Sequence, residues 1–178
     1  MKKSIILFCF ICLSVVLKGQ SVSTHRIGDA IMDIKGSVSE YVYYDLGSLN
    51  KDEIDFQVVE VKDIINEAKD FYMRYRYIAP VDKNLCIGSY TESDIPKIIT
   101  LLQYANNIIG TSPQHTTQVI YITDSNQSVS VFKGAKEWKI SLRTDHDSRN
   151  TQIDISEKAM NDLLNFFNQA LSTIDNLK

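Results

Sequence analysis

A wide apolar stripe near the C-terminus constrains the fold of this 178-residue chain more than any other sequence feature. Ser156 precedes the stripe as a helix cap, and Glu157 is placed to interact favourably with the helix dipole. The apolar side chains then recur at helical spacing: Met160, Leu163, Leu164, Phe167, Leu171 and Ile174. A helix with so wide a stripe must bury it against another layer, and we expect that layer to be a β-sheet.

A second amphipathic helix is predicted shortly after the middle of the chain. Ser93 or Asp94 caps it, Pro96 lies in its first turn, and Gly110 ends it. Its apolar side chains also recur near helical spacing: Ile95, Ile98, Ile99, Leu102, Ala105 and Ile109. We expect both helices to pack on one face of the same sheet.

Segments rich in aromatic and β-branched residues predict the strands. Before the first helix we expect three strands, over residues 40–44, 55–62 and 69–78, with a further short strand at 85–87. Four more strands are expected before the last helix: 119–122, 129–132, 138–142 and a short one around 153–155. The connections between these four strands are short, which favours an antiparallel meander.

The predicted fold is therefore a single α+β domain, in the order three strands, a helix, four strands and a helix. Its centre is one curved antiparallel sheet. A small barrel closed by the C-terminal helix is the alternative architecture.

The N-terminus has the pattern of a secretory signal peptide, with two lysines, an apolar run from Ser4 to Leu17 and small residues after it. That run is shorter than the roughly 20 apolar residues of a spanning helix, so we expect no stable membrane anchor. Residues 1–20 are predicted to be the signal peptide, 21–37 a loosely ordered arm, and 38–178 the folded domain. The expected location is extracytoplasmic: periplasm, cell surface or medium.

Charge and cysteine content restrict the partners and the chemistry. The formal net charge is −3, and loss of the leader with its lysines makes the chain more acidic, which argues against nucleic acid as a partner. Two of the three cysteines lie in the leader, so only Cys86 remains and no intramolecular disulfide can form. Cys86 stands in an apolar segment and is predicted to be a buried structural thiol. His25, His115 and His146 are scattered without the spacing of metal ligands. We expect no catalytic, metal or cofactor site.

Tyrosines and arginines on two early strands predict an interaction face. In the 69–78 segment Phe71 begins one alternating set, while Tyr72, Arg74 and Arg76 belong to the other. Tyr44 is predicted to lie beside them. Tyrosine carries an apolar ring with a polar tip, which suits contact with another protein, although cross-strand packing in an ordinary sheet explains the same pattern.

These features favour an exported, non-catalytic binding or accessory domain that recognises a protein partner through a sheet edge or the Tyr/Arg face. An immunity or inhibitor protein, or a component of an envelope complex, would fit this hypothesis. A carrier of a small or lipidic ligand is the first alternative, and it would need an apolar cavity of several hundred Å³, about the size of a typical ligand pocket. A small hydrolase with a site assembled from distant residues is the second alternative.

Overall fold

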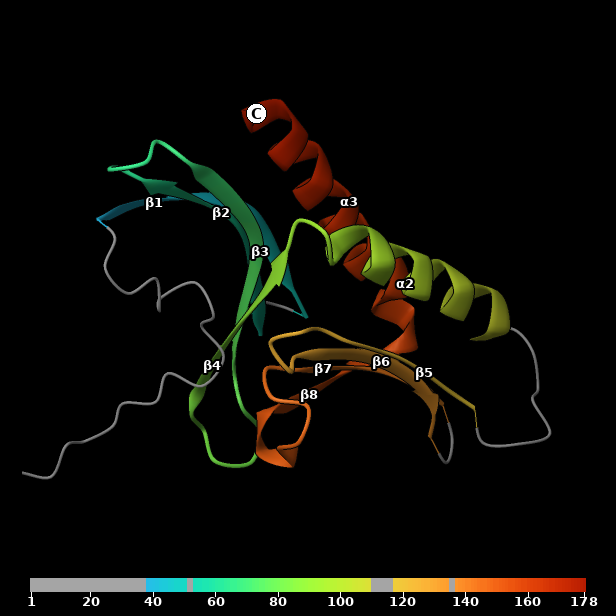
Figure 1. The fold of residues 1–178 in the computed structure, drawn as a ribbon. Helices are drawn as coiled ribbons and strands as arrows, with labels where there is room; N and C mark the ends of the chain where they lie inside the picture. Colours follow the sequence, from blue (N-terminus) through green and yellow to red (C-terminus); the bar gives the residue numbers. More distant parts are fainter. Residues whose placement is uncertain (1–37, 51–52, 110–116, 135–136) are drawn as a thin grey trace, which may run out of the picture.

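The computed structural model describes residues 38–50, 53–109, 117–134 and 137–178. The predicted signal peptide and N-terminal arm lie outside these residues. Figure 1 shows two antiparallel sheets, each with four strands, and two helices between and beside them. Within the described ranges, no helix combines the length and apolarity needed to cross a membrane.

The first sheet is a meander in the order β1-β2-β3-β4. Its strands are β1 (Ser39–Leu49), β2 (Ile54–Asp63), β3 (Lys69–Ile78) and β4 (Leu85–Thr91). Alternate side chains of β3 are buried, as the period-2 pattern predicts for a strand with one face in the core. β2 alternates in the same way from Ile54 to Val58, and Val59 and Val61 on its other side are also buried. We call this side of the sheet the core face and the other side the outer face.

Helix α2 (Ile95–Ile109) carries the chain from the first sheet to the second. The second sheet is again a meander, followed by the C-terminal helix: β5 (Gln118–Ile122), β6 (Ser128–Lys133), β7 (Trp138–Arg143), β8 (Gln152–Ser156) and α3 (Met160–Leu177). Short 3₁₀ turns precede β8 and α3. Helix α2 packs on β5 and β6, whereas α3 packs on β1, β2 and β3 and against α2.

The α+β class and the antiparallel strands are confirmed, but the arrangement differs from the prediction in three respects. Four strands precede α2 in place of three, because the short segment predicted at 85–87 is part of a full strand, β4, of seven residues. The described strands form two sheets in place of one curved sheet or a small barrel. The helices therefore cover different sheets. One physical reason lies at the edge of β4, where the Ser89 N–H donates to the Gln127 side-chain oxygen (2.8 Å), so a side chain occupies the place of a further strand.

One cluster of buried side chains joins both sheets and both helices. At its centre, aromatic rings from the first sheet and α3 form a continuous series of ring contacts, some stacked and some tilted. Ring centres are 6.5 Å apart for Phe56 and Tyr75, 5.1 Å for Tyr75 and Tyr90, and 5.6 Å for Tyr90 and Phe167. Phe166 extends the series and is stacked on Phe56, with ring centres 4.8 Å apart. The apolar stripe of α3 is thus buried against the core face of the first sheet.

Two tyrosine hydroxyl groups connect the sheets. The Tyr75 hydroxyl donates to the Arg143 carbonyl at the end of β7 (3.1 Å), and the Tyr77 hydroxyl donates to the Thr151 carbonyl just before β8. Tyr75 occupies this position because it lies over Gly88 of β4. A Cβ added to Gly88 would come within 2.3 Å of the Tyr75 ring.

Substitution Gly88→Ala tests this close approach. The added methyl group must displace a fully buried ring, so we expect the free energy of unfolding to fall by about 1–3 kcal/mol, as in overpacked cores. Urea denaturation followed by circular dichroism measures the change. Ser89→Ala is the matched control, because the Ser89 hydroxyl is buried without a hydrogen-bond partner among the described residues. Equal stability of the Gly88→Ala variant and the unsubstituted protein would contradict the prediction.

Candidate functional site

The structure places three of the four predicted interface residues on one surface. Tyr72, Arg74 and Arg76 lie on the outer face of the first sheet, in one row along β3. Tyr44 lies on the core face instead, because it pairs with Val58, which is fully buried in the core. The predicted group of four is therefore divided between the two faces.

Tyr43 takes the place expected for Tyr44. It is 44% exposed, and the Arg74 guanidinium lies over its ring at 5.3 Å from the ring centre. Tyr43 and Tyr72 both pair with Val59, one from each side of β2. The sequence analysis missed Tyr43, although three tyrosines in the segment 41–44 gave a signal that one or more of them faces outward.

Tyr44 instead belongs to a polar cluster at the margin of the core. Its hydroxyl donates to one carboxylate oxygen of Glu60 (3.0 Å), and the Lys69 ammonium lies 2.7 Å from the other oxygen. The hydrogen bond from Lys69, together with the one from Tyr44, lowers the pKa of Glu60 despite its burial. The charged Glu60 in turn raises the pKa of Tyr44. This arrangement stabilises the fold and leaves these groups paired.

The outer face of the first sheet is largely occupied by contacts within the sheet. Arg76 pairs with Asp55 at 2.8 Å, so its charge is already balanced. Val59 and Val61 are buried at the centre of this face, with Tyr41 and Tyr72 packed against them. These are the cross-strand pairs of an ordinary sheet, so the face offers a partner ring and guanidinium surface more than unbalanced charge.

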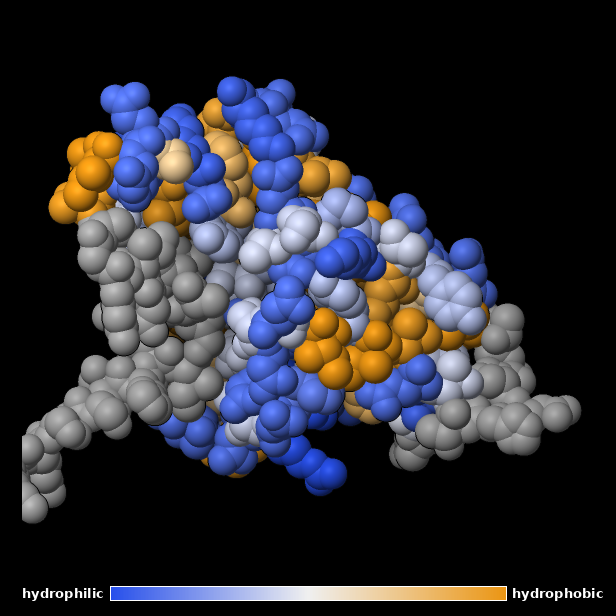
Figure 2. Space-filling view, viewed as in Figure 1, coloured by the Kyte–Doolittle hydropathy of each residue, from blue (hydrophilic) through white to orange (hydrophobic). Residues whose placement is uncertain are grey.

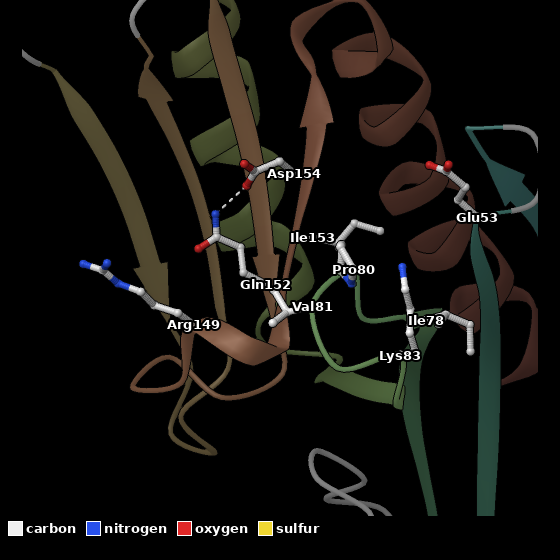
Figure 3. A pocket seen from close by; sticks show the side chains of 9 residues that line it. All are labelled: Glu53, Ile78, Pro80, Val81, Lys83, Arg149, Gln152, Ile153 and Asp154. Carbon is white, nitrogen blue, oxygen red and sulfur yellow. Dashed lines mark hydrogen bonds between the residues drawn. The ribbon is translucent and has the colours of Figure 1, made fainter.

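A cleft of about 790 Å³ lies between the two sheets. Figure 3 shows its walls: β8 on one side, and on the other the β3–β4 hairpin with the adjacent ends of β2 and β3. The cleft opens to the surface, and its lining combines apolar and charged side chains from distant parts of the chain: Glu53, Ile78, Pro80, Val81, Lys83, Arg149, Gln152, Ile153 and Asp154. The volume falls within the range of typical ligand sites, roughly 300–1,000 Å³.

The apolar part of the cleft is unusually exposed. Val81, in the turn of the β3–β4 hairpin, is 71% exposed, and Ile78 is 54% exposed. Charged side chains surround them, with Lys83 and Glu53 on the same wall as Ile78 (Figure 3). Exposed apolar groups within a charged rim are typical of protein contact sites.

The cleft also borders an open strand edge. Among the described strands, β8 is the last in its sheet and pairs only with β7. Consecutive residues of β8, Gln152 to Asp154, line the cleft, so both faces of the strand contribute to it along this edge. An edge strand presents backbone N–H and C=O groups that an extended chain can pair with.

The cleft and the predicted face are continuous. Ile78, which lines the cleft, is the last residue of β3 and follows Arg76 and Arg74 in the outer-face row. A partner seated in the cleft can therefore extend along the row toward Tyr72. In the sequence, only Ile78 indicates this continuity, because it falls in the outward-facing set of the alternating pattern of β3.

The chemically reactive side chains do not meet in the cleft. Cys86 is buried on the core face beside Tyr77, and burial raises the pKa of its thiol. His146 does not line the cleft, and its ring Nδ1 lies 3.2 Å from the Ser128 hydroxyl. His25 and His115 fall outside the described residues. Over the described ranges, no three His, Cys, Asp or Glu side chains converge to hold a metal ion.

Comparisons with known proteins add no family to this picture. No protein-family model matches the chain, and neither the curated proteins nor the solved structures contain a match. The functional inference therefore depends on the chain's own surface.

Substitution Glu60→Gln tests the polar cluster around Tyr44 through its pH dependence. The pKa of Glu60 is lowered in the folded protein, so the ionised carboxylate stabilises the fold above about pH 5. This stabilisation is lost as the pH falls through the lowered pKa. Near neutral pH we expect Glu60→Gln to cost about 1–2 kcal/mol of unfolding free energy, and the difference from wild type to shrink in acid.

Urea denaturation across the acidic range measures this difference. Glu92→Gln is the control, since Glu92 pairs with Lys178 on the surface with both side chains more than two-fifths exposed. Such exposed pairs contribute little to stability. A Glu60→Gln destabilisation that is the same at every pH would contradict the prediction.

Proposed function

We propose that this chain is a non-catalytic binding domain, and that it recognises a protein partner by accepting an extended segment into the cleft beside β8. The observation that carries the proposal is the coincidence of an open strand edge with Ile78 and Val81, two exposed apolar side chains in a charged rim. Each feature alone is common on protein surfaces. Together they supply the two elements of strand addition: backbone pairing for affinity and side-chain contacts for specificity.

The lining indicates what the bound segment contains. A strand paired with β8 directs alternate side chains to opposite faces of the second sheet. Those on the side of Ile153 meet apolar surface from Pro80 and Ile78, so this set is expected to be apolar. The rim supplies both signs of charge, with Lys83 and Glu53 on the hairpin wall. The segment is therefore expected to alternate apolar residues with polar or charged ones.

The outer-face row extends the proposed surface. A partner larger than a short peptide would reach Arg76, Arg74 and Tyr72 from the cleft, because these residues follow Ile78 along β3. We propose that they form a secondary contact, in which Tyr72 and Arg74 supply aromatic and guanidinium surface. Arginine and tyrosine are enriched in protein interfaces.

An extracytoplasmic location belongs to the same proposal. The signal-peptide pattern of residues 1–20 supports this part of the proposal, and without that leader a single cysteine, Cys86, remains. An inhibitor, an immunity protein or an accessory subunit of an envelope complex would use such a recognition surface. The packed aromatic rings between the first sheet and α3 give less support to a carrier of lipidic ligands.

Selection of short peptides from a displayed library tests the proposed function. We expect the purified chain to select extended sequences with alternating apolar residues. On binding, backbone amide signals of β8 and the β3–β4 hairpin should shift in nuclear magnetic resonance spectra. Selection of no sequence, or shifts confined to other surfaces, would contradict the proposal.

Substitution Val81→Asp sharpens the test. A carboxylate in the apolar part of the cleft should weaken peptide binding at least tenfold, or by about 1.4 kcal/mol. Because Val81 is 71% exposed, the substitution should leave the stability of the fold unchanged. Ile65→Asp is the matched control, since Ile65 is 65% exposed in the β2–β3 turn at the other end of the sheet. Calorimetric titration of both variants with a selected peptide measures the difference.

A further inference from the structure

We infer that the segment accepted beside β8 is acidic: its apolar residues alternate with Asp or Glu, whose carboxylates face a basic rim formed by Lys83, Arg143 and Arg149. This inference rests on the proposed function, because it names the chemistry of the partner at the same cleft. The carboxylates are assigned to side chains, since an extended strand presents the same face at every second residue.

The single carboxylate that β8 contributes to the cleft is already paired. The Lys139 ammonium lies 3.8 Å from one carboxylate oxygen of Asp154, and the Gln152 side-chain amide donates to the other oxygen (2.5 Å; Figure 3). These three side chains lie on the outer side of the second sheet, where they alternate with the buried apolar residues of β7 and β8. Asp154 therefore offers little free negative charge to repel an acidic segment.

Two cations of the cleft lining remain unpaired. Lys83 lies on the hairpin wall, and Arg149 begins the 3₁₀ turn that leads into β8. Both are exposed, and neither side chain makes an ion pair or a hydrogen bond with the described residues. Glu53 is the unpaired carboxylate of the lining, and it lies on the wall opposite β8 (Figure 3). The free charge of the lining is thus mainly positive, although the whole chain has a net charge of −3.

Arg143 adds positive charge behind the edge strand. It lies opposite Gln152 in the register of β7 and β8. Its guanidinium donates to the Gln152 side-chain oxygen (2.6 Å) and to the His146 carbonyl (3.0 Å). Both acceptors are neutral, so within the described ranges no carboxylate balances this charge. A strand added at β8 would lie about 10 Å from β7, or two strand spacings, which is close to the screening length at moderate salt.

The basic rim meets one side of an added strand. Its side chains on the side of Ile153 enter the apolar part of the cleft, whereas the alternate set passes along Gln152 and Asp154 toward Arg149. Figure 2 shows hydrophilic side chains over the lower end of the molecule, where Figure 1 places the β3–β4 hairpin, in contrast to the apolar side chains over α2 and β5. Charge complementarity of this kind steers a partner and fixes its register.

The sequences selected from the displayed library separate this inference from the proposed function. We expect Asp and Glu to be enriched at the positions that alternate with apolar residues. Amidation of the peptide C-terminus should leave the affinity unchanged, because the carboxylates belong to side chains. Selected peptides that alternate but lack acidic residues, or that bind only through a free C-terminus, would overturn this inference alone. Selection of no peptide would overturn the proposed function as well.

Charge reversal at the rim tests the assigned residues. We expect a selected acidic peptide to bind about tenfold more tightly than its copy with Asn and Gln in place of Asp and Glu. Arg149→Glu and Lys83→Glu should each reduce this preference, and rising salt should reduce it further. Calorimetric titration measures the affinities, and circular dichroism checks that the variants keep the fold.

Lys178→Glu is the matched control, because it changes the net charge equally at the C-terminal end of α3, far from β8 (Figure 1). Its ion pair with Glu92 is exposed, so its loss should have little effect on the fold. This variant should keep the full preference for the acidic peptide. An equal loss of preference in Lys178→Glu, or no loss in Arg149→Glu and Lys83→Glu, would overturn the inference.

Discussion

The contact between the Tyr75 ring and Gly88 is the constraint on which the relative position of the two sheets depends. Gly88 has no Cβ, so the ring lies directly over the backbone of β4 and its hydroxyl reaches the Arg143 carbonyl of the second sheet. The same ring is stacked with Tyr77 and Tyr90, which fixes its orientation. A larger residue at position 88 would move the ring and with it the hydrogen bond between the sheets.

The cleft follows from this junction. The Tyr77 hydroxyl bonds to the carbonyl of Thr151, the residue before β8, so the start of β8 is held against the end of β3. Ile78 follows Tyr77 and Gln152 follows Thr151, and both of these residues line the cleft. The proposed binding surface is therefore located where the core of the molecule ends. One wall is the strand β8, whereas the other is built mainly from the β3–β4 turn with Pro80, Val81 and Lys83.

The sequence predicted the elements of this fold better than their arrangement. The stripe of α3 and the alternation in β3 depend on local periodicity, which a sequence displays directly. The division into two sheets involves contacts between residues far apart in the chain, such as the bond from Ser89 to Gln127, and no local pattern reports them. Tyr44 was assigned to the wrong face because residues 40–44 do not by themselves show which alternate set faces the core, and the pairing of Tyr44 with Val58 decides this. The cleft was not predicted, since it combines three separate segments.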